Sequence, residues 1–486
     1  MNCEGRDDVG RRFYRRCQEL LTEEIEGPSI TALQCHIFSV IYLTNASFYN
    51  TAHSTLALAI RAGVIVGLHL EPSGCMPASQ REFRKRLWWT LYALEMKAAM
   101  ELGRPLVVNV SQVTCNLPKD DKDATGLSDS TSTFTGDGVT GYTWNLQFIK
   151  LILAARSVYI TFCHKCAEIL RNNGGNSPYN DPQALEVCAE YLLSRMDFLQ
   201  TWLHGVPESL KIKRKGTGEL FSTDRSPLDL KSMSPFWLHR HKLLLEFLYH
   251  NLSMNLYRPF ICFFRVSDAC TKMTDNNAMA CVNHAVTITQ IIHQIPIEGD
   301  VLDGWHEILQ WQWNAILSLV GYILTYPLAP STPSARKALS IAIRVFELLE
   351  SNVPCAANAA SVARDLSGKA DFLVDHFRSN LTTLTPSRWD NGDVLQKYGS
   401  DFRSPNFVSQ LEGLSPVMVP NELGSRSLND FASTYGSDTF IPDLNWDPEL
   451  SLPWLPSMET NAELGWNTEG LELRQVREWR DFSNEA

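Results

Sequence analysis

The sequence predicts an all-α protein that ends in a long polar tail. Helical periodicity dominates residues 28–384, no set of alternating strands interrupts it, and Pro, Ser, Asn and Asp dominate the sequence beyond it. We therefore expect a poorly defined segment at residues 1–27, a large multi-helix domain at 28–384, and a disordered acidic tail at 385–486.

The segment Arg81–Leu102 shows the helical pattern clearly, because apolar residues recur in it every three or four positions. Ser79 and Glu82 fit a capping box at its start, and Gly103 should end it in a left-handed conformation. Further helices are expected at Tyr142–Arg171, Pro182–Leu203, Pro235–Phe264, Asn276–Ile295, Gly304–Tyr326 and Ser334–Leu349. Two polar stretches, at about 119–141 and 211–230, should be long surface loops.

Acidic charge is concentrated in the tail. Residues 386–486 carry 17 Asp and Glu against 7 Lys and Arg, so they hold 7 − 17 = −10 of the net charge of −11. The rest of the chain is almost neutral, which argues against broad electrostatic attraction to nucleic acid. The N-terminus lacks the apolar core of a signal peptide. Trp311–Ala329 is the best membrane candidate, but its polar residues and Pro327 favour a buried core helix.

Two motifs suggest nucleotide or diphosphate chemistry, and their context argues against both. Gly136–Gly141 matches the dinucleotide fingerprint, but no strand precedes it and no acidic residue follows about 20 positions later. Asp120, Asp121 and Asp123 resemble a magnesium-binding acidic motif, yet they lie in a predicted loop and no second ligand set is visible. A solvated acidic loop is the better interpretation.

Two other motifs resemble parts of zinc sites. Cys163 and Cys166 have half of a zinc-ligand spacing, but they lie in a helical run without a second close pair, so we expect two buried or half-buried thiols. His306 and Glu307 begin like a zinc-protease helix, but Gln310 stands where the second His is required. The twelve cysteines are scattered singly, as in reduced intracellular proteins. The sequence predicts no enzyme and no cofactor.

One dense basic cluster is present. It consists of Lys211, Lys213, Arg214 and Lys215 within KIKRK. Such a cluster suits a nuclear import signal or a phosphate contact, and a merely solvated loop is an equally good interpretation.

An ordered series of short motifs runs from Ala32 to Pro118. After a helix of the type LQCHIFSVIYL come Gly67, Leu68 and His69, then Arg84 and Arg86 in a basic run, then Trp88 and Trp89, and finally Gly103, Arg104 and Pro105. Arg258 and Pro259 extend the series downstream. This series resembles the fungal-specific transcription factor domain, the regulatory (middle homology) region of fungal zinc-cluster transcription factors. In physical terms these residues are mainly scaffold: helix stops, core tryptophans and paired cations.

The resemblance implies a nuclear regulator of RNA polymerase II genes, controlling a metabolic or secondary-metabolite pathway. It also implies coactivators or a partner transcription factor as partners, a possible small-molecule effector and no membrane. In the family, an N-terminal six-cysteine zinc cluster reads DNA, whereas only Cys3 and Cys17 precede Cys35 here. We therefore expect no zinc in this chain unless such a cluster precedes it, and its direct contact with DNA is doubtful.

The tail contains apolar residues among its acids, as an activation segment does. The residues are Phe440, Leu444, Trp446, Leu450, Trp454 and Leu455. The alternative is a disordered tail without function. Two other functions also stay open: an interaction partner or inhibitor of a full-length factor, and an all-α small-molecule enzyme, which the lack of paired acid–base or metal ligands disfavours.

Overall fold

The computed structural model describes residues 4–46, 48–120, 141–175, 177–230, 235–262, 271–298, 301, 307–349 and 354–382. Within these ranges the chain is helical, and the only strand-like pairing described is an isolated bridge between Arg214 and Leu228. The all-α prediction is thus confirmed. The tail at 385–486, with its six predicted activation residues, lies outside the described residues.

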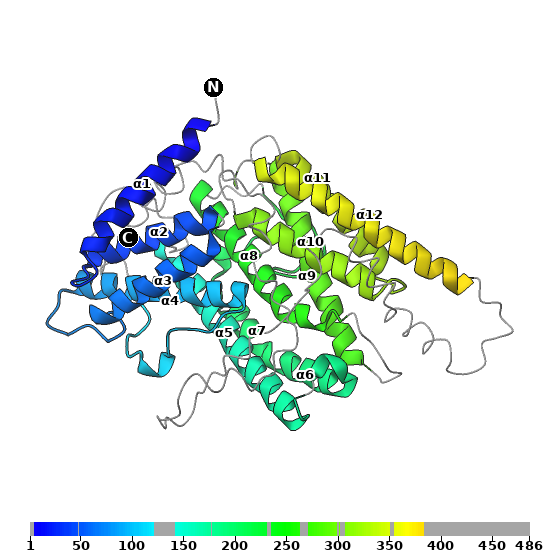
Figure 1. Cartoon of the computed structure of the whole chain (residues 1–486), viewed down its shortest axis with the longest axis horizontal. Coiled ribbons are helices and arrows are strands. Elements are labelled where there is room, and N and C mark those ends of the chain that lie inside the picture. The colour runs from blue at the N-terminus through cyan, green and yellow to red at the C-terminus, as the bar shows by residue number, and fades with distance from the viewer. Residues whose placement is uncertain are drawn as a thin grey trace.

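The described part of the chain is a series of α-helices. They are α1 (Glu4–Glu23), α2 (Ile30–Asn45), α3 (Tyr49–Ile65), α4 (Ala78–Leu102), α5 (Gly141–Asn172), α6 (Pro182–Arg195), α7 (Asp197–Gly205), α8 (Phe236–Tyr257), α9 (Lys272–Glu298), α10 (Glu307–Thr325), α11 (Thr332–Leu349) and α12 (Pro354–Thr382). Figure 1 shows α1–α4 at one end of the molecule, α11 and α12 at the other, and α8 and α9 in the middle. One continuous apolar core joins these helices.

Helix ends are set partly as the sequence predicts. Gly103 ends α4 with φ 64°, the left-handed conformation expected of it. Asp181 caps α6, because its carboxylate accepts hydrogen bonds from the backbone N–H groups of the second and third helical residues. The capping box before α4 is wrong: the helix begins after Pro77, and Glu82 instead accepts a 2.8 Å bond from the backbone N–H of Lys119.

The N-terminal segment is better defined than the sequence suggests. Residues 4–23 form α1, whose Tyr14 ring stacks on Tyr42 of α2 at 5.3 Å and whose Leu21 is buried. Helical structure therefore begins before residue 28, and the domain boundary expected there stays a prediction. Periodicity missed this helix because charged residues interrupt its pattern and most residues from Gly10 to Glu23 are exposed.

Helix α10, which contains most of the apolar stretch Trp311–Ala329, is a core helix. Trp311, Gln312 and Trp313 on its first turns are all buried. Among the described helices, one stretch, Tyr142–Asn172 in α5, is long and apolar enough to cross a membrane by length and composition. Half of its most apolar 18-residue window is buried inside the protein, as in a helix of a folded core.

Candidate functional site: a buried polar cluster beside the signature residues

The signature tryptophans are packing residues. Trp88 and Trp89 are 1% and 7% exposed, so α4 buries both rings. The Trp88 ring lies 5.9 Å from that of His69, and the indole N–H of Trp89 donates a 3.0 Å bond to the carbonyl of Asn116. The apolar stripe expected on α4 is broader than predicted, because the helix is covered on most of its sides.

The basic run of α4 is used within the domain. Arg84 donates a 2.7 Å bond to the carbonyl of Val66 at the end of α3. Arg86 is buried with its guanidinium 4.0 Å from the centre of the Tyr142 ring, and burial lowers the pKa of Arg86. These arginines hold helices together rather than presenting charge to a partner.

The remaining signature residues end helices. Gly67 follows α3 with φ 78°, and the buried Leu68 folds back to donate a 2.9 Å backbone bond to Gly63. The carbonyl of His69 accepts bonds from two backbone N–H groups, those of residues 114 and 115. At the other end of α4, Arg104 binds the side chain of Asn50, and the exposed Pro105 follows.

The downstream pair, Arg258 and Pro259, ends α8. The helix stops at Tyr257, short of the predicted Phe264, because a proline two residues later cannot continue the hydrogen-bond ladder. Arg258 turns back and donates a 2.6 Å bond to Asn255.

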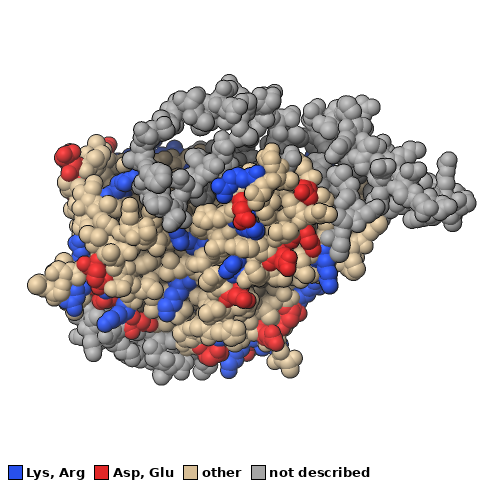
Figure 2. All heavy atoms as spheres, turned by 90° about the horizontal axis from the view of Figure 1, so that it is seen from below, with Lys and Arg blue, Asp and Glu red and all other residues tan. Residues whose placement is uncertain are grey.

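The basic cluster of residues 211–215 is divided by the fold. Lys213 and Lys215 are exposed and Lys211 is half-buried with its ammonium 2.7 Å from Glu208. Arg214, however, is buried in an ion pair with Glu246, so it differs from Lys213 and Lys215 in accessibility. A role of the four cations in nuclear import stays a prediction. On the face drawn in Figure 2, basic and acidic side chains are interspersed among uncharged ones.

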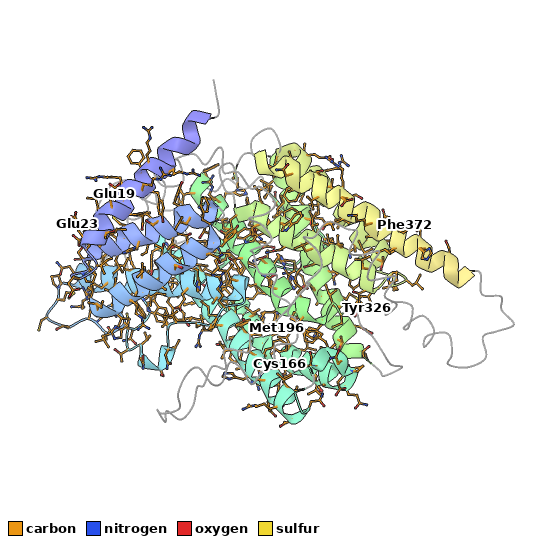
Figure 3. The ribbon with its side chains drawn as sticks, viewed as in Figure 1. Glu19, Glu23, Cys166, Met196, Tyr326 and Phe372 are labelled. Carbon is orange, nitrogen blue, oxygen red and sulfur yellow. The ribbon has the colours of Figure 1, made fainter. Side chains whose placement is uncertain are left out.

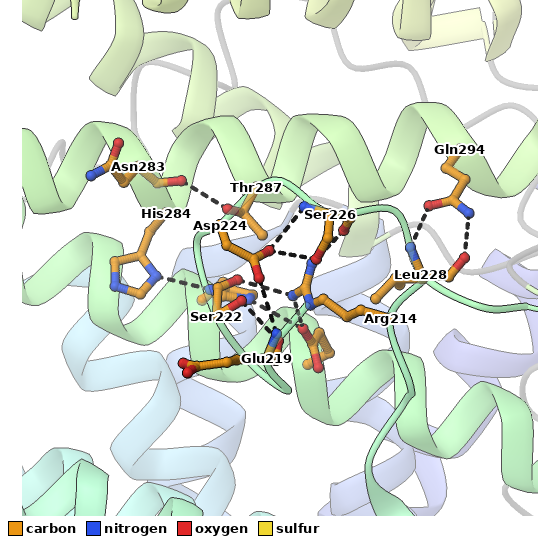
Figure 4. Close-up of polar contacts among 12 residues, drawn as sticks. Arg214, Glu219, Ser222, Asp224, Ser226, Leu228, Asn283, His284, Thr287 and Gln294 are labelled. Atoms are coloured by element: carbon orange, nitrogen blue, oxygen red, sulfur yellow. Dashed lines mark hydrogen bonds and ion pairs between the residues drawn. The ribbon is translucent and has the colours of Figure 1, made fainter. Parts of the chain in front are cut away.

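Residues 211–230 form a non-helical connection that side-chain hydrogen bonds hold in place (Figure 4). The guanidinium of Arg214 donates bonds of 3.0 and 2.9 Å to the carbonyls of Ser222 and Ser226. Asp224 accepts bonds from the side chain and backbone of Ser226 and from the backbone of Glu219, and these bonds hold the pKa of Asp224 well below its usual range.

Helix α9 clamps the far end of this connection. The Gln294 side chain accepts a 2.9 Å bond from the N–H of Leu228 and donates a 2.7 Å bond to its carbonyl (Figure 4). Leu228 and Phe221 are themselves buried in the core. Residues 211–230 are thus fixed by an arginine to one central helix and by a glutamine to the next.

Four buried polar side chains link this connection to α8 and α9. It comprises Arg214, Glu246, His250 and His284, which we call the buried polar cluster. The Arg214 and Glu246 side chains are 2% and 0% exposed and 2.5 Å apart. Nε2 of His250 lies 3.4 Å from the same Glu246 oxygen, and its Nδ1 lies 2.8 Å from Nδ1 of His284.

The chemistry of these groups constrains their protons. An ionised Glu246 only accepts hydrogen bonds, so Nε2 of His250 carries the proton that faces it. The 2.8 Å contact between Nδ1 of His250 and Nδ1 of His284 needs one proton between the two nitrogens, and either ring can supply it. Burial first, and then the neighbouring His250, hold the pKa of His284 well below its usual value, so His284 is neutral.

The cluster holds three elements of the fold in register. Its members come from the 211–230 connection, α8 and α9, and Tyr257 at the end of α8 stacks on His284 at 6.0 Å. In the part of the chain that the structure describes, no group of three or more His, Cys, Asp or Glu is arranged to hold a metal ion.

The weaker candidate motifs are not brought together with this cluster. Cys163 and Cys166 are buried in α5, as the sequence predicts, and Asp120 accepts a 2.6 Å bond from Thr143. The other candidates lie outside the described residues, namely Asp121, Asp123, residues 136–140 and His306. Sequence reasoning missed the buried polar cluster, although Glu246 and His250, four residues apart in the apolar run LLLEFLYHNL, were a signal for it.

Comparison with known proteins gives the chain its family. The sequence model of the "Fungal specific transcription factor domain" matches residues 11–187, from within α1 to α6. "Transcription factor asqA" of Emericella nidulans is 35% identical over 405 residues, which cover 82% of this chain and 71% of that protein. "Terreic acid cluster-specific transcription factor atF" of Aspergillus terreus is 34% identical over 377 residues, covering 75% of this chain and 56% of that protein.

More distant similarity extends to a further regulator. "Oosporein cluster regulator OpS3" of Beauveria bassiana is 23% identical over 341 residues, which cover 64% of this chain and 44% of that protein. The chain thus spans about half the length of atF and OpS3 and about seven-tenths of asqA. No solved structure matches the chain. These matches and the all-α fold show that the chain belongs to the fungal specific transcription factor domain family. The relatives named above are transcription regulators.

Proposed function

We propose that the chain is the regulatory part of a fungal transcription factor that controls a secondary-metabolite gene cluster. The observation that carries this proposal is the extended match to asqA and atF, together with the names of atF and OpS3 as regulators of single metabolite clusters. The fold supports it, because the signature residues serve packing and the charged residues of α4 and α8 are used inside the domain. The proposal assigns no catalytic activity to the chain.

Within this function, the helical domain is the element that receives a signal and the tail is the element that delivers it. A small-molecule effector or a partner factor would act on the domain by changing how the 211–230 connection sits on α8 and α9. The acidic, aromatic residues 440–455 would contact coactivators in the nucleus. Direct DNA contact is left to other residues of the transcription factor or to a partner.

The test is genetic. Deletion of the gene in its fungus should abolish the transcripts of one biosynthetic cluster and the corresponding metabolite, and reintroduction of the gene should restore both. A rise in those transcripts on deletion would instead support the alternative, an inhibitory partner of a full-length factor. Unchanged transcripts in the deletion and overexpression strains, across conditions that induce and repress the cluster, would refute the proposal.

A further inference from the structure

Two cysteines far apart in the sequence meet in the fold. Cys166 on α5 and Cys188 on α6 have sulfur atoms 3.8 Å apart, and both are free thiols. The residues are 7% and 2% exposed. Figure 3 labels Cys166 where α5 runs beside α6, and the two helices pack directly on each other. No spacing in the sequence pairs these cysteines, since they belong to different helices.

The geometry is close to that of a disulfide. An S–S bond is about 2.05 Å long, so the two sulfur atoms must approach by about 1.8 Å from their 3.8 Å separation. Small side-chain rotations on the two packed helices can supply this movement. Helix α6 is short, with 14 residues, and lies at the periphery of the molecule (Figure 1), where Glu186 accepts hydrogen bonds from the first turn of α9.

The two thiols also differ in acidity in a way that suits oxidation. The thiol of Cys166 donates its hydrogen bond to Cys188. That bond, together with the nearby ammonium of Lys165, lowers the pKa of Cys188, whereas the same pairing and burial raise the pKa of Cys166. By contrast, burial raises the pKa of Cys163, one turn earlier on α5. The hydrogen bond between the two sulfurs thus favours Cys188 as the attacking sulfur, since the thiolate is the form that reacts with oxidants.

We propose that Cys166 and Cys188 form a peroxide-sensitive pair that closes a reversible disulfide between α5 and α6. The Cys188 thiolate attacks one oxygen of hydrogen peroxide, the O–O bond breaks, and Cys188 sulfenic acid and hydroxide form. The sulfur of Cys166 then attacks the sulfenic sulfur, the S–O bond breaks, and the disulfide forms. The protons of the two thiols leave in the two water molecules produced, so two thiols and one peroxide give one disulfide and two waters.

The disulfide would close a loop of 22 residues and join α5 to α6 covalently, restricting the unfolded chain and the movement of α6. A cellular thiol would restore the reduced form by exchange, as expected of a disulfide in a reducing compartment. The inference is independent of which genes the protein controls.

The experiment treats the reduced, full chain with increasing hydrogen peroxide, alkylates the remaining thiols, and identifies linked peptides by mass spectrometry without reduction. A peptide pair containing Cys166 and Cys188 should appear, disappear on treatment with dithiothreitol, and raise the melting temperature while present. The variants C166A and C188A should lose it. The matched control C163A removes a buried thiol from the same helix and should keep it.

The exposed Cys75 serves as an internal measure of oxidant delivery. Oxidation of Cys75 while Cys166 and Cys188 remain fully alkylatable would overturn the proposal. Linkage of Cys166 to another cysteine in preference to Cys188 would overturn it as well. Because the linked peptide is read in the wild-type chain, the test does not depend on the stability of any variant.

Discussion

Replacing Arg214 with methionine should strongly destabilise the protein, although Arg214 lies in a segment that the sequence presents as a polar loop. The change keeps most of the aliphatic stem and removes the guanidinium. That group forms the 2.5 Å ion pair with Glu246 and the bonds to the carbonyls of Ser222 and Ser226. Both charged side chains are almost fully buried, so neither partner can turn to water when the other is lost.

The expected loss of stability follows from the polar groups that the substitution leaves unpaired. An uncompensated buried charge costs about 3–5 kcal/mol when one partner of a buried ion pair is removed. Glu246 keeps its contact with Nε2 of His250, but the 3.4 Å between nitrogen and oxygen is too long for a strong hydrogen bond. The two freed carbonyls belong to a partly exposed connection, so each adds at most about 1 kcal/mol. We expect a loss of about 4 kcal/mol of unfolding free energy.

Urea denaturation of the full chain, followed by circular dichroism, measures this loss. Lys213→Met is the matched control, because Lys213 is the exposed neighbour and its replacement should change stability by no more than about 0.5 kcal/mol. The double variant R214M/E246Q removes both charges and should recover at least half of the loss. If Arg214→Met costs less than about 1 kcal/mol, the ion pair is not the anchor of the 211–230 connection.

Three further predictions concern the core, the pH response and the tail. Trp88→Ala should cost about 3–5 kcal/mol in the same denaturation assay through lost burial and the cavity left behind, whereas Phe13→Ala, at a residue 66% exposed, should change little. Burial lowers the pKa of His241 to about 3, so the stability linked to its neutral form is complete above about pH 6.5 and is lost as the pH falls. Lowering the pH from 7 to 5 should reduce the free energy of unfolding by about 2 kcal/mol through this residue. His241→Phe should remove that part of the pH dependence. If the dependence of stability on pH is the same in His241→Phe as in the wild type, His241 is not its source. Residues 386–486 fused to a heterologous DNA-binding domain should activate a yeast reporter. The Trp446→Ala, Trp454→Ala double variant should lose most of that signal, whereas single Asp→Asn changes should lose little. An inactive wild-type fusion would count against an activation segment.

The sequence predicted the helices whose burial is one-sided or complete over many turns. Long apolar patterns located α5, α9, α10 and α11 to within a few residues, since packing against neighbours imposes regular spacing. Prediction from the sequence failed where a side chain has more than one available hydrogen-bond partner. Glu82 had the spacing for a capping box, but the chain returns at Lys119 and takes its carboxylate. The predicted helix Pro182–Leu203 is two helices, with the break at Met196.

The candidate site was less predictable, because its members are distant in sequence. Arg214 illustrates the difficulty. Counting charges in KIKRK treats all the cations as equivalent, whereas an extended chain points alternate side chains to opposite sides. Ile212 and Arg214 consequently face the core, while Lys213 and Lys215 face solvent. Alternation around the buried Ile212 was the available signal, and the basic composition concealed it.

The position of the buried polar cluster separates two kinds of residue in this domain. The signature residues of α3 and α4 lie within residues 11–187, which the family model matches, and they pack helices and end them. Arg214, Glu246, His250 and His284 lie beyond that match. Apolar side chains of similar volume would fill their space at equal or better stability, since desolvating two charges offsets much of their attraction. What apolar side chains would not supply is direction: the guanidinium binds one carboxylate and two carbonyls at fixed angles and so gives residues 211–230 one position on α8. The charges therefore specify where this connection sits more than how stable the domain is.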